Sequence, residues 1–358
     1  MDEVMLVTGG CGFIGSCFIL QQMRKYPDLR LINLDKLTYA GNPDNVKEVA
    51  GDPRYAFVQA DVADRAAVEA VFDKYRPTLV IHFAAESHVD RSIVGPDVFV
   101  RTNVLGTQVL LDVTRRQWQE DACMNTARFL YVSTDEVYGD LPLESTEKFT
   151  EDSPLRPSSP YSVSKAAGDM MAQAYHRTYG MLTLITRSSN NYGPRQYPEK
   201  LIPLAIKKAL AGESIPVYGD GRNVRDWLYA EDNCRAIDAV LRKGTPGQIY
   251  NVGGGNELSN IDLIHLLLHL LAQQTGTPEE DYLKLITFVP DRPGHDRRYA
   301  LDSTKTEKHV DWTPVSDVEA LLKRTVEYYA GHSCEPWSAE PLCFAAHGRR
   351  NQTRSASS

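Results

Sequence analysis

Residues 133–136 of this chain read Ser-Thr-Asp-Glu and directly follow an apolar run, residues 129–132. Two neighbouring carboxyl groups at the end of a buried strand are costly, because each carboxylate loses water and the two charges repel. A turn could also place Asp here without any chemical role. In a catalytic site the repulsion is useful, since it leaves one group ionised and the other protonated. We therefore expect one of Asp135 and Glu136 to be ionised and the other protonated.

Tyr161 and Lys165 form a second candidate pair at the start of an expected helix that follows a proline-rich loop. Their spacing of four residues places both side chains on one helix face. An ammonium group lowers the pKa of a nearby phenol, so we expect Lys165 to make Tyr161 a usable base near neutral pH. This spacing is common on exposed helices, and its meaning depends on a nucleotide site elsewhere in the chain.

A glycine-rich loop, residues 9–15, lies between an expected strand and an expected helix. Such glycines let the backbone approach a pyrophosphate, whose charge the helix N-terminus binds. Asp35 ends the next expected strand about 20 residues further on, where a carboxylate accepts hydrogen bonds from a ribose diol and repels a 2′-phosphate. The combination predicts NAD rather than NADP as the cofactor.

Short β-rich runs alternate with helical stretches over the first half of the chain, with apolar residues on both faces of each run. This alternation predicts an α/β fold, a Rossmann-like doubly wound parallel sheet, with a smaller mixed α/β lobe towards the C-terminus. Ligands bind beyond the carboxyl ends of such strands. The segment containing Thr134, Asp135 and Glu136 is one of these ends, so we expect it to face the cofactor.

Charge and composition exclude several classes of protein. The chain has 358 residues, 42% of them hydrophobic, and a formal charge of −8, which argues against a general nucleic-acid-binding protein. There is no basic leader and no apolar run of about 18 residues, so we expect neither secretion nor a membrane span. The six cysteines, Cys11, Cys17, Cys123, Cys234, Cys334 and Cys343, form no CxxC pair, which favours reduced thiols in the cytoplasm.

No metal site is expected. His265 and His269 are four residues apart, the spacing of a metal-binding pair, but the helix carries no acidic residue in the HExxH position. We interpret them as histidines on a helix surface.

The motifs TGGCGFIG, AAESHVDRS, STDEVYG and YSVSK together resemble the extended short-chain dehydrogenase/reductase family, in its sugar-nucleotide branch. The likeness continues through SSNNYGPRQYPEKLIP, VRDWLYAEDNCRA, YNVGGGNE and DRPGHDRRYA, and extends from residue 4 to about residue 330. The segment between Gly139 and Pro160 is shorter than in many relatives. The resemblance implies a homodimer paired through helices near residues 97–118 and 161–179.

The resemblance also implies a domain division. Residues 1–188 would form the NAD-binding Rossmann domain, with return segments near residues 226–251. Residues 189–225 and 252–332 would form the lobe that binds a sugar nucleotide. Residues 333–358 have no recognised counterpart in the family, and their polar composition predicts a disordered tail.

By the same resemblance the reaction would be a 4,6-dehydration of a glucose nucleotide, with dTDP-glucose as the expected substrate. Tyr161 would take the proton of the C4 hydroxyl while C4 gives its hydride to NAD, and Thr134 would bind the same oxygen. Glu136 would remove the C5 proton and Asp135 would protonate the departing C6 hydroxyl. Hydride would then return to C6.

Binding residues are carried over in the same way. Those implied for NAD are Gly9, Gly12, Phe13, Ile14, Gly15, Asp35, Lys36, Leu37, Thr38, Asp61, Val62, Phe83, Ala84, Ala85, Ser87, Thr102, Tyr161, Lys165 and Asn191. Those implied for the substrate are Ser87, Thr134, Asn190, Lys200, Leu201, Pro216, Val217, Tyr218, Arg225, Asn260, Asp291, Arg292, Pro293, Gly294 and His295. Arg91, Arg297 and Arg298 lie in matching motifs, and we interpret them as members of internal salt bridges.

Three functions remain open at this point. One is the dehydration itself, acting on either dTDP-glucose or UDP-glucose. A second is epimerisation or decarboxylation of a UDP-sugar by a relative, whose corresponding strand end resembles Ser-Ser-Ala and lacks the acid pair. A third is a non-catalytic NAD-binding module, which would be expected to have lost one or more of Thr134, Asp135, Glu136, Tyr161 and Lys165; all five are present.

Overall fold

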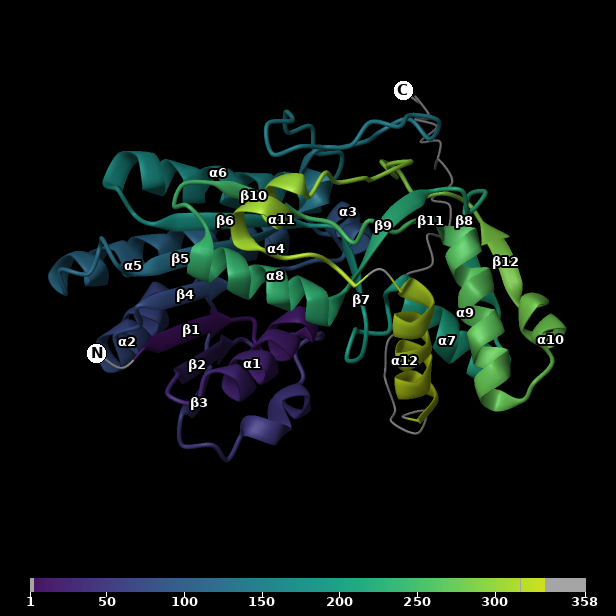
Figure 1. The fold of residues 1–358 in the computed structure, drawn as a ribbon, viewed down its shortest axis with the longest axis horizontal. Helices are drawn as coiled ribbons and strands as arrows, with labels where there is room; N and C mark the ends of the chain where they lie inside the picture. The colour runs from purple at the N-terminus through teal and green to yellow at the C-terminus, as the bar shows by residue number, and fades with distance from the viewer. Residues whose placement is uncertain (1–2, 316, 332–358) are drawn as a thin grey trace, which may run out of the picture.

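A seven-stranded parallel sheet forms the centre of the larger part of the computed structural model, which describes residues 3–315 and 317–331 (Figure 1). The strand order is β10-β6-β5-β4-β1-β2-β3, so the chain order reverses between β1 and β4. At such a switch point the strand ends leave a crevice for ligands. The strands are β1 (Val4–Thr8), β2 (Arg30–Asp35), β3 (Tyr55–Gln59), β4 (Leu79–His82), β5 (Arg128–Thr134), β6 (Thr183–Ser188) and β10 (Ile249–Val252).

Helices cover both faces of this sheet, because successive residues of each strand point to opposite sides and both sides are apolar. Val7 packs towards α1 and α8, whereas its neighbour Leu6 packs towards α2 and α5. The helices are α1 (Phe13–Lys25), η1 (Pro43–Val49), α2 (Arg65–Tyr75), α3 (Val89–Val94), α4 (Asp97–Phe99), η2 (Val100–Gly106), α5 (Thr107–Glu120), η3 (Asp135–Val137), α6 (Pro160–Tyr179), α8 (Ala230–Lys243) and α11 (Thr304–Val310). The predicted fold class is confirmed.

The smaller lobe has its own apolar core, built around Trp227, Leu267 and Leu322. It lies beside the carboxyl ends of the main sheet, at the right of Figure 1. Its elements are β7 (Asn190–Tyr192), α7 (Leu201–Leu210), β8 (Ile215–Tyr218), β9 (Val224–Tyr229), β11 (Glu257–Ser259), α9 (Asn260–Thr275), α10 (Glu279–Leu283), β12 (Ile286–Val289) and α12 (Val318–Gly331).

The return of the chain to the large sheet runs through α8 and β10, whereas β9 pairs with β7 and β11 in the smaller lobe. These separate cores support the division into an NAD-binding domain and a substrate lobe, which stays a prediction. The predicted tail, residues 333–358, lies outside the described residues, as do Cys334 and Cys343.

Helix α6 carries Tyr161 and Lys165, and local sequence fixes both of its ends. Ser159 and Ser162 form a reciprocal capping box at the N-terminus, and Pro160 occupies the first turn, where it needs no hydrogen-bond acceptor. Gly180 ends the helix in the left-handed region, with φ of 71°. Tyr161 and Lys165 therefore keep a fixed position along the sheet.

A buried ion pair joins the middle of α6 to the neighbouring strand β6. Arg187 Nε lies 2.8 Å from Asp169 Oδ2, and both side chains are almost fully buried. The Arg187 guanidinium also lies over the Tyr138 ring, 4.7 Å from its centroid. Asp169 continues the helix face of Tyr161 and Lys165, since it follows Lys165 by four residues.

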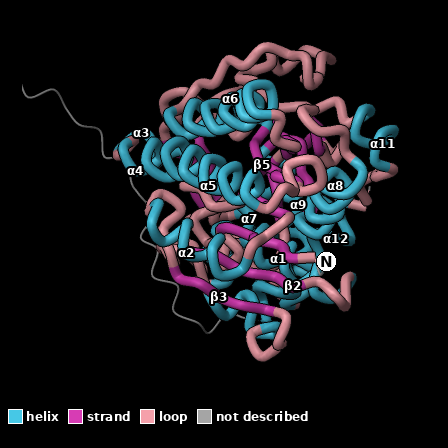
Figure 2. The backbone as a smooth tube through the Cα atoms, turned by 90° about the vertical axis from the view of Figure 1, so that its left-hand side faces the viewer, coloured by secondary structure: helices cyan, strands magenta, loops and turns pink. Residues whose placement is uncertain are grey.

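The helix expected over residues 97–118 is interrupted by a wide π-turn segment, η2. Its Asn103 accepts a hydrogen bond from the Glu86 amide at 2.9 Å and donates to the Glu86 carbonyl at 3.0 Å and to Ser164 Oγ at 2.8 Å. Such turns recur at functional sites. Figure 2 shows α3 and α4 beside the ends of α5 and α6.

The three arginines interpreted as structural do form salt bridges. Arg91 pairs with Glu199 at 3.2 Å, Arg297 with Asp220 at 3.2 Å and Arg298 with Glu257 at 2.8 Å. His265 and His269 lie on the exposed side of α9, as expected. Within residues 3–315 and 317–331 no group of side chains is arranged to hold a metal ion, and no helix is long and apolar enough to cross a membrane.

Candidate active site

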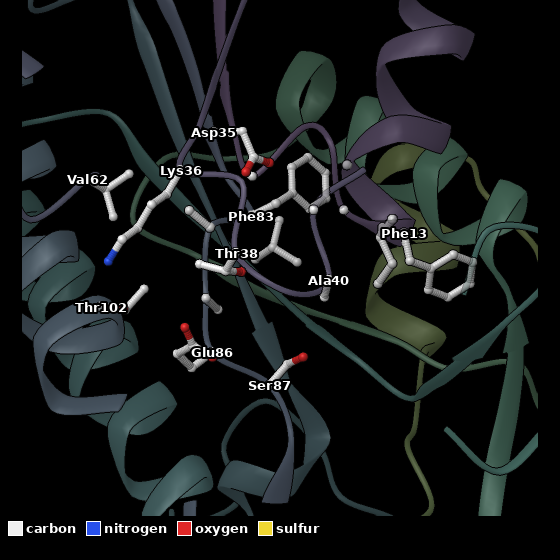
Figure 3. Close-up of a pocket in the computed structure, with 18 of the residues that line it drawn as sticks. Phe13, Asp35, Lys36, Thr38, Ala40, Val62, Phe83, Glu86, Ser87 and Thr102 are labelled. Atoms are coloured by element: carbon white, nitrogen blue, oxygen red, sulfur yellow. The ribbon is translucent and has the colours of Figure 1, made fainter. Parts of the chain in front are cut away.

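A cavity opens below the glycine loop, at the carboxyl ends of β1, β2 and β4 (Figure 3). Gly9 has φ of 72°, and a Cβ there would lie 2.7 Å from the Ala84 amide nitrogen; a Cβ at Gly15 would lie 2.3 Å from the Gly9 carbonyl oxygen. At both positions the loop packs so closely against neighbouring backbone that an added side chain would clash, and its approach to a pyrophosphate stays a prediction. Predicted cofactor residues that line the cavity are Gly9, Gly12, Phe13, Ile14, Gly15, Asp35, Lys36, Thr38, Asp61, Val62, Phe83, Ala84, Ala85, Ser87, Thr102, Tyr161 and Lys165.

Asp35 closes β2 at the wall of this cavity. Its two carboxylate oxygens accept from the Cys11 amide at 2.9 Å and the Leu37 amide at 2.8 Å. Burial raises the pKa of Asp35, and these two amides oppose the shift. A carboxylate held in this way can still accept from ribose hydroxyls through its second lone pairs. The glycine cradle and Asp35 together fit an NAD dinucleotide.

Leu37 and Asn191 do not line this cavity, unlike the other predicted cofactor residues. The Leu37 amide is used by Asp35, and the residue itself adopts a φ of 57°. Asn191 donates to the Ser189 carbonyl at 2.9 Å and accepts from Asn233 at the same distance. Both residues shape the backbone near the cavity.

The strand end with the acid pair continues directly into a short 3₁₀ turn, η3. Thr134 caps this turn, because its hydroxyl accepts from the Glu136 amide at 3.4 Å. The same hydroxyl donates to Asp135 Oδ1 at 3.2 Å and is hydrogen-bonded with the Tyr161 phenol. One threonine thus contacts the acid pair and the tyrosine.

Asp135 is buried, with 2% of its surface exposed, and its Oδ2 has no hydrogen-bond partner within the described part of the chain. Desolvation raises its pKa well above the usual value, and the charges of Glu136 and Asp226 add to this effect. Burial also raises the pKa of Glu136, but Arg292, Lys200 and Arg225 oppose the shift. The environments support the expected assignment, with Asp135 protonated and Glu136 ionised.

The expected effect of Lys165 on the phenol is not found. Burial and the Glu136 carboxylate raise the Tyr161 pKa, and the hydrogen bond with Thr134 only partly opposes this. The Lys165 ammonium donates to the Val132 carbonyl at 2.6 Å and lies over the Tyr131 ring. Desolvation lowers the Lys165 pKa to about 7. The shared helix face was therefore predicted correctly, and the electrostatic consequence was not.

A second cavity lies between the strand end and the smaller lobe, and Glu136 lines it. Four cations line this cavity, the three predicted to bind substrate (Lys200, Arg225 and Arg292) and Arg91, and together they suit an anionic ligand. Predicted substrate residues that line it are Asn190, Lys200, Leu201, Pro216, Val217, Tyr218, Arg225, Asn260, Arg292 and His295.

Five predicted substrate residues lie elsewhere. Ser87 lines the cofactor cavity, and Thr134, the last residue of β5, is buried and lines neither cavity. Asp291 accepts from His295 Nδ1 at 2.6 Å and so helps to orient His295, which lines the second cavity. Asp291, Pro293 and Gly294 do not line the second cavity.

Several lining residues were not predicted. Asp90 accepts from Arg292 at 2.9 Å and from the Tyr218 hydroxyl at 3.1 Å. His88, Arg91 and Glu199 also line the second cavity, and burial lowers the His88 pKa to about 3. Asp90 and its partners are more than 100 residues apart in the sequence, so no local spacing indicates their contact.

Comparisons with known proteins identify the family. The family model described as GDP-mannose 4,6 dehydratase matches residues 6–325. A dTDP-glucose 4,6-dehydratase from Neisseria gonorrhoeae is 48% identical over 330 residues, covering 91% of this chain and 95% of that protein.

Solved structures give the same result. A dTDP-glucose 4,6-dehydratase from Streptomyces venezuelae, solved with NAD and dTDP bound, has a TM-score of 0.84 and 46% identity, covering 92% of this chain and 97% of that one. A UDP-glucose 4-epimerase from Thermotoga maritima, solved with UDP-glucose, has a TM-score of 0.81 but 30% identity, covering 92% and 99%. The TM-scores of the dehydratase and the epimerase are nearly equal, so the fold does not distinguish dehydration from epimerisation. The sequence identities differ, 46% against 30%, and favour the dehydratase. The chain belongs to the dTDP-glucose 4,6-dehydratase family, in the sugar-nucleotide branch of the extended short-chain dehydrogenases/reductases.

Proposed function

We propose that this protein is an NAD-dependent hydro-lyase that converts dTDP-glucose to dTDP-4-keto-6-deoxyglucose. The observation that carries this proposal is the adjacency of a buried acid, Asp135, and a base, Glu136, beside the hydroxyls of Thr134 and Tyr161. An epimerase needs no such acid pair. The relatives named above are dehydratases, so epimerisation and decarboxylation are not favoured.

Tyr161 is the proposed base for the C4 hydroxyl of the sugar. Its phenol is buried and hydrogen-bonded with Thr134, so the two groups can hold one substrate oxygen between them. Because burial and Glu136 raise its pKa, ionisation requires help when the ligands bind. Lys165, whose amine lines the cofactor cavity, is the nearest candidate for that help.

NAD, when bound, supplies the hydride acceptor for C4 and afterwards returns the hydride to C6. The glycine loop would hold its pyrophosphate, and Asp35 the adenosine ribose. Thr102, Ala84 and Ala85 line the remaining length of the cavity.

Elimination of water is assigned to the acid pair. Once C4 is a ketone, the C5 proton is acidic, and the Glu136 carboxylate removes it. Asp135 gives its proton to the C6 hydroxyl, which leaves as water. Glu136 then returns a proton to C5. Asp135 then regains a proton and Tyr161 loses the one it took from the C4 hydroxyl, so all three groups return to their starting states with no net proton gained or lost.

The diphosphate and base are assigned to the second cavity. Lys200, Arg225 and Arg292 would bind the diphosphate, and the edge formed by residues 216–218 would contact the base. Uracil differs from thymine by a single methyl group, a difference worth about 1–3 kcal/mol in an apolar pocket, and UDP-glucose also carries a ribose 2′-hydroxyl that dTDP-glucose lacks. We therefore expect dTDP-glucose to be preferred over UDP-glucose by a modest factor.

The deciding experiment is to incubate the purified protein with dTDP-glucose and catalytic NAD. The expected result is a product with the alkali-generated absorbance of a 4-keto-6-deoxy sugar, without net formation of NADH. Parallel incubations with UDP-glucose, CDP-glucose and GDP-mannose measure the base preference. Formation of dTDP-galactose, or no turnover with any glucose nucleotide, would refute the proposal.

We further propose that the enzyme is a homodimer. Apolar side chains are exposed along η2 and α6, including Val100 at 56%, Leu105 at 44%, Val163 at 52% and Met170 at 56%. Four exposed apolar side chains on two segments that pack together suit a contact with a second copy, in which two helices from each copy would make a four-helix interface. Sedimentation should give a dimer, and Val163→Glu with Met170→Glu a monomer; a monomeric parent protein would refute this.

A cytoplasmic location completes the proposal. Cys11, Cys17, Cys123 and Cys234 are free thiols, which fits a reducing compartment. The proposed substrate is a nucleotide sugar, the cofactor is a dinucleotide, and the partner is a second copy of the chain.

A further inference from the structure

Two residues, Glu199 and Lys200, line both the cofactor cavity and the substrate cavity. They belong to the segment 193–200, which connects β7 to α7. Lys200 Nζ donates to the Ser87 carbonyl at 2.8 Å, and so joins this segment to the loop after β4. This short segment therefore separates the cofactor cavity from the substrate cavity.

Glu199 is held by two residues from distant segments. Its Oε1 accepts from the Tyr39 hydroxyl at 3.1 Å and its Oε2 accepts from Arg91 Nε at 3.2 Å. The Arg91 guanidinium also lies over the Tyr39 ring, 3.8 Å from the centroid, so each of the three side chains contacts the other two. Only 10% of the Glu199 side chain is exposed, which strengthens charged hydrogen bonds.

Tyr39 belongs to the loop that follows β2, and this loop is a wall of the cofactor cavity. Lys36, Thr38, Ala40 and Gly41 all line that cavity, on either side of Tyr39 (Figure 3 shows the first three). Tyr39 thereby fixes this loop to Glu199, and the edge contact of its ring with Tyr197 adds a second link to the same segment.

We propose that Tyr39, Arg91 and Glu199 form a clasp. The clasp holds the loop after β2, residues 36–41, against the segment before α7 and so slows the release of the reduced dinucleotide. This inference rests on the proposed function, since hydride taken from C4 must return to C6 of the same sugar. If the reduced cofactor dissociated between these steps, the oxidised 4-keto sugar could not be reduced at C6. The three residues are positioning residues, and the clasp is needed for retention rather than for proton transfer.

The test measures dissociation of NADH from the holoenzyme, by stopped-flow fluorescence with excess NAD as competitor. Glu199→Gln and Tyr39→Phe should each accelerate release about tenfold, the factor expected for a lost hydrogen bond to a charged group. The double variant should release NADH no faster than about the faster single variant, because both changes open the same clasp. Glu213→Gln, which removes an exposed ion pair with Lys208, is the matched control and should leave release unchanged.

Unchanged release in both single variants would overturn the clasp, and so would fully multiplicative effects in the double variant. A purely structural role predicts a lower melting temperature of the cofactor-free protein without faster release, and that result would also overturn it. Because the dissociation assay contains no sugar, it can fail while the dehydratase assay succeeds, and the reverse. With dTDP-glucose, Glu199→Gln should in addition accumulate free NADH and keto sugar that the parent enzyme does not release.

Discussion

Lys165 Nζ donates a hydrogen bond of 2.6 Å to the carbonyl oxygen of Val132, two residues before Thr134 on β5. The bond joins the helix that carries the tyrosine to the strand that carries the acid pair. The desolvated ammonium is also close to the cofactor cavity, which it lines. Lys165 thus has a structural partner on β5, which its spacing to Tyr161 did not indicate.

Glu136→Gln should separate oxidation from elimination. The amide cannot take the C5 proton, so hydride transfer to NAD persists while product formation falls about 10²–10⁴-fold. Incubation in deuterium oxide should show no exchange at C5, as measured by mass spectrometry of recovered sugar. Glu144→Gln, an exposed loop residue, is the control and should exchange normally. Normal C5 exchange in Glu136→Gln would remove Glu136 from this role.

Asp135→Asn should leave that exchange in place. The variant keeps the base but has no proton to give the C6 hydroxyl, so loss of water becomes about 10²–10⁴-fold slower. Deuterium should therefore enter C5 of unreacted substrate in excess over turnover. If exchange and turnover fall together, the two carboxyl groups do not have separate roles.

Tyr161→Phe should slow the first oxidation itself, by about 10²–10⁴-fold. Neither reduced cofactor nor C5 exchange should then appear on the time scale of the parent reaction, in contrast to the Glu136 variant. Single-turnover absorbance at the NADH band measures this directly. Rapid reduction of NAD in Tyr161→Phe would assign the C4 proton to another group.

Gly15→Ala should weaken cofactor binding although alanine favours a helix. The new Cβ would lie 2.3 Å from the Gly9 carbonyl oxygen, and relief of that contact displaces the loop, at a cost of about 1–3 kcal/mol. We expect NAD affinity to fall about tenfold or more by calorimetry. Gly51→Ala, where nothing lies within 4 Å of the added carbon, should bind NAD normally. Equal affinities in the two variants would contradict the close approach.

His82 should make the protein sensitive to acid. The ring is fully buried between Thr8 Oγ1 at 2.7 Å and Thr107 Oγ1 at 3.0 Å, and burial lowers its pKa to about 3. Unfolded histidine titrates near pH 6.5, so between these values the unfolded chain binds more protons than the folded one. The free energy of unfolding should fall with decreasing pH, by up to about 1.4 kcal/mol per pH unit from this group.

His82→Asn keeps a polar side chain but cannot take up that proton. Denaturant unfolding between pH 6.5 and 4 should therefore show a smaller decrease for the variant than for the parent, whatever its absolute stability. Parallel pH dependences for the two proteins would show that His82 does not control this loss.

The parallel sheet could be predicted because its strands are continuous apolar runs separated by helices. Strand ends were less certain: β3 ends at Gln59, before Asp61, because Asp61 accepts from the Ala63 amide and starts a turn. The glycine loop, Asp35 and the acid pair are local features and could be located from spacing alone.

Contacts between distant segments could not be predicted. Asp90 reaches Arg292 and Tyr218, and Glu199 reaches Tyr39, only because the smaller lobe packs over the strand ends. Lys165 shows a further limit, since helix spacing predicts a shared face but not which acceptor the ammonium will choose. The acceptor is the backbone carbonyl of Val132, and because every residue has such a group, side-chain types cannot indicate which one is used.

The buried ion pair of Asp169 and Arg187 opposes any shift of α6 along the sheet. Asp169, Lys165 and Tyr161 occupy consecutive turns of a single helix face, so a slip of α6 by one residue would strand two opposite charges in a dry interior. Such a slip is far costlier than a lost apolar contact. The tyrosine is thereby kept in register with the strand end by an ion pair that touches neither ligand.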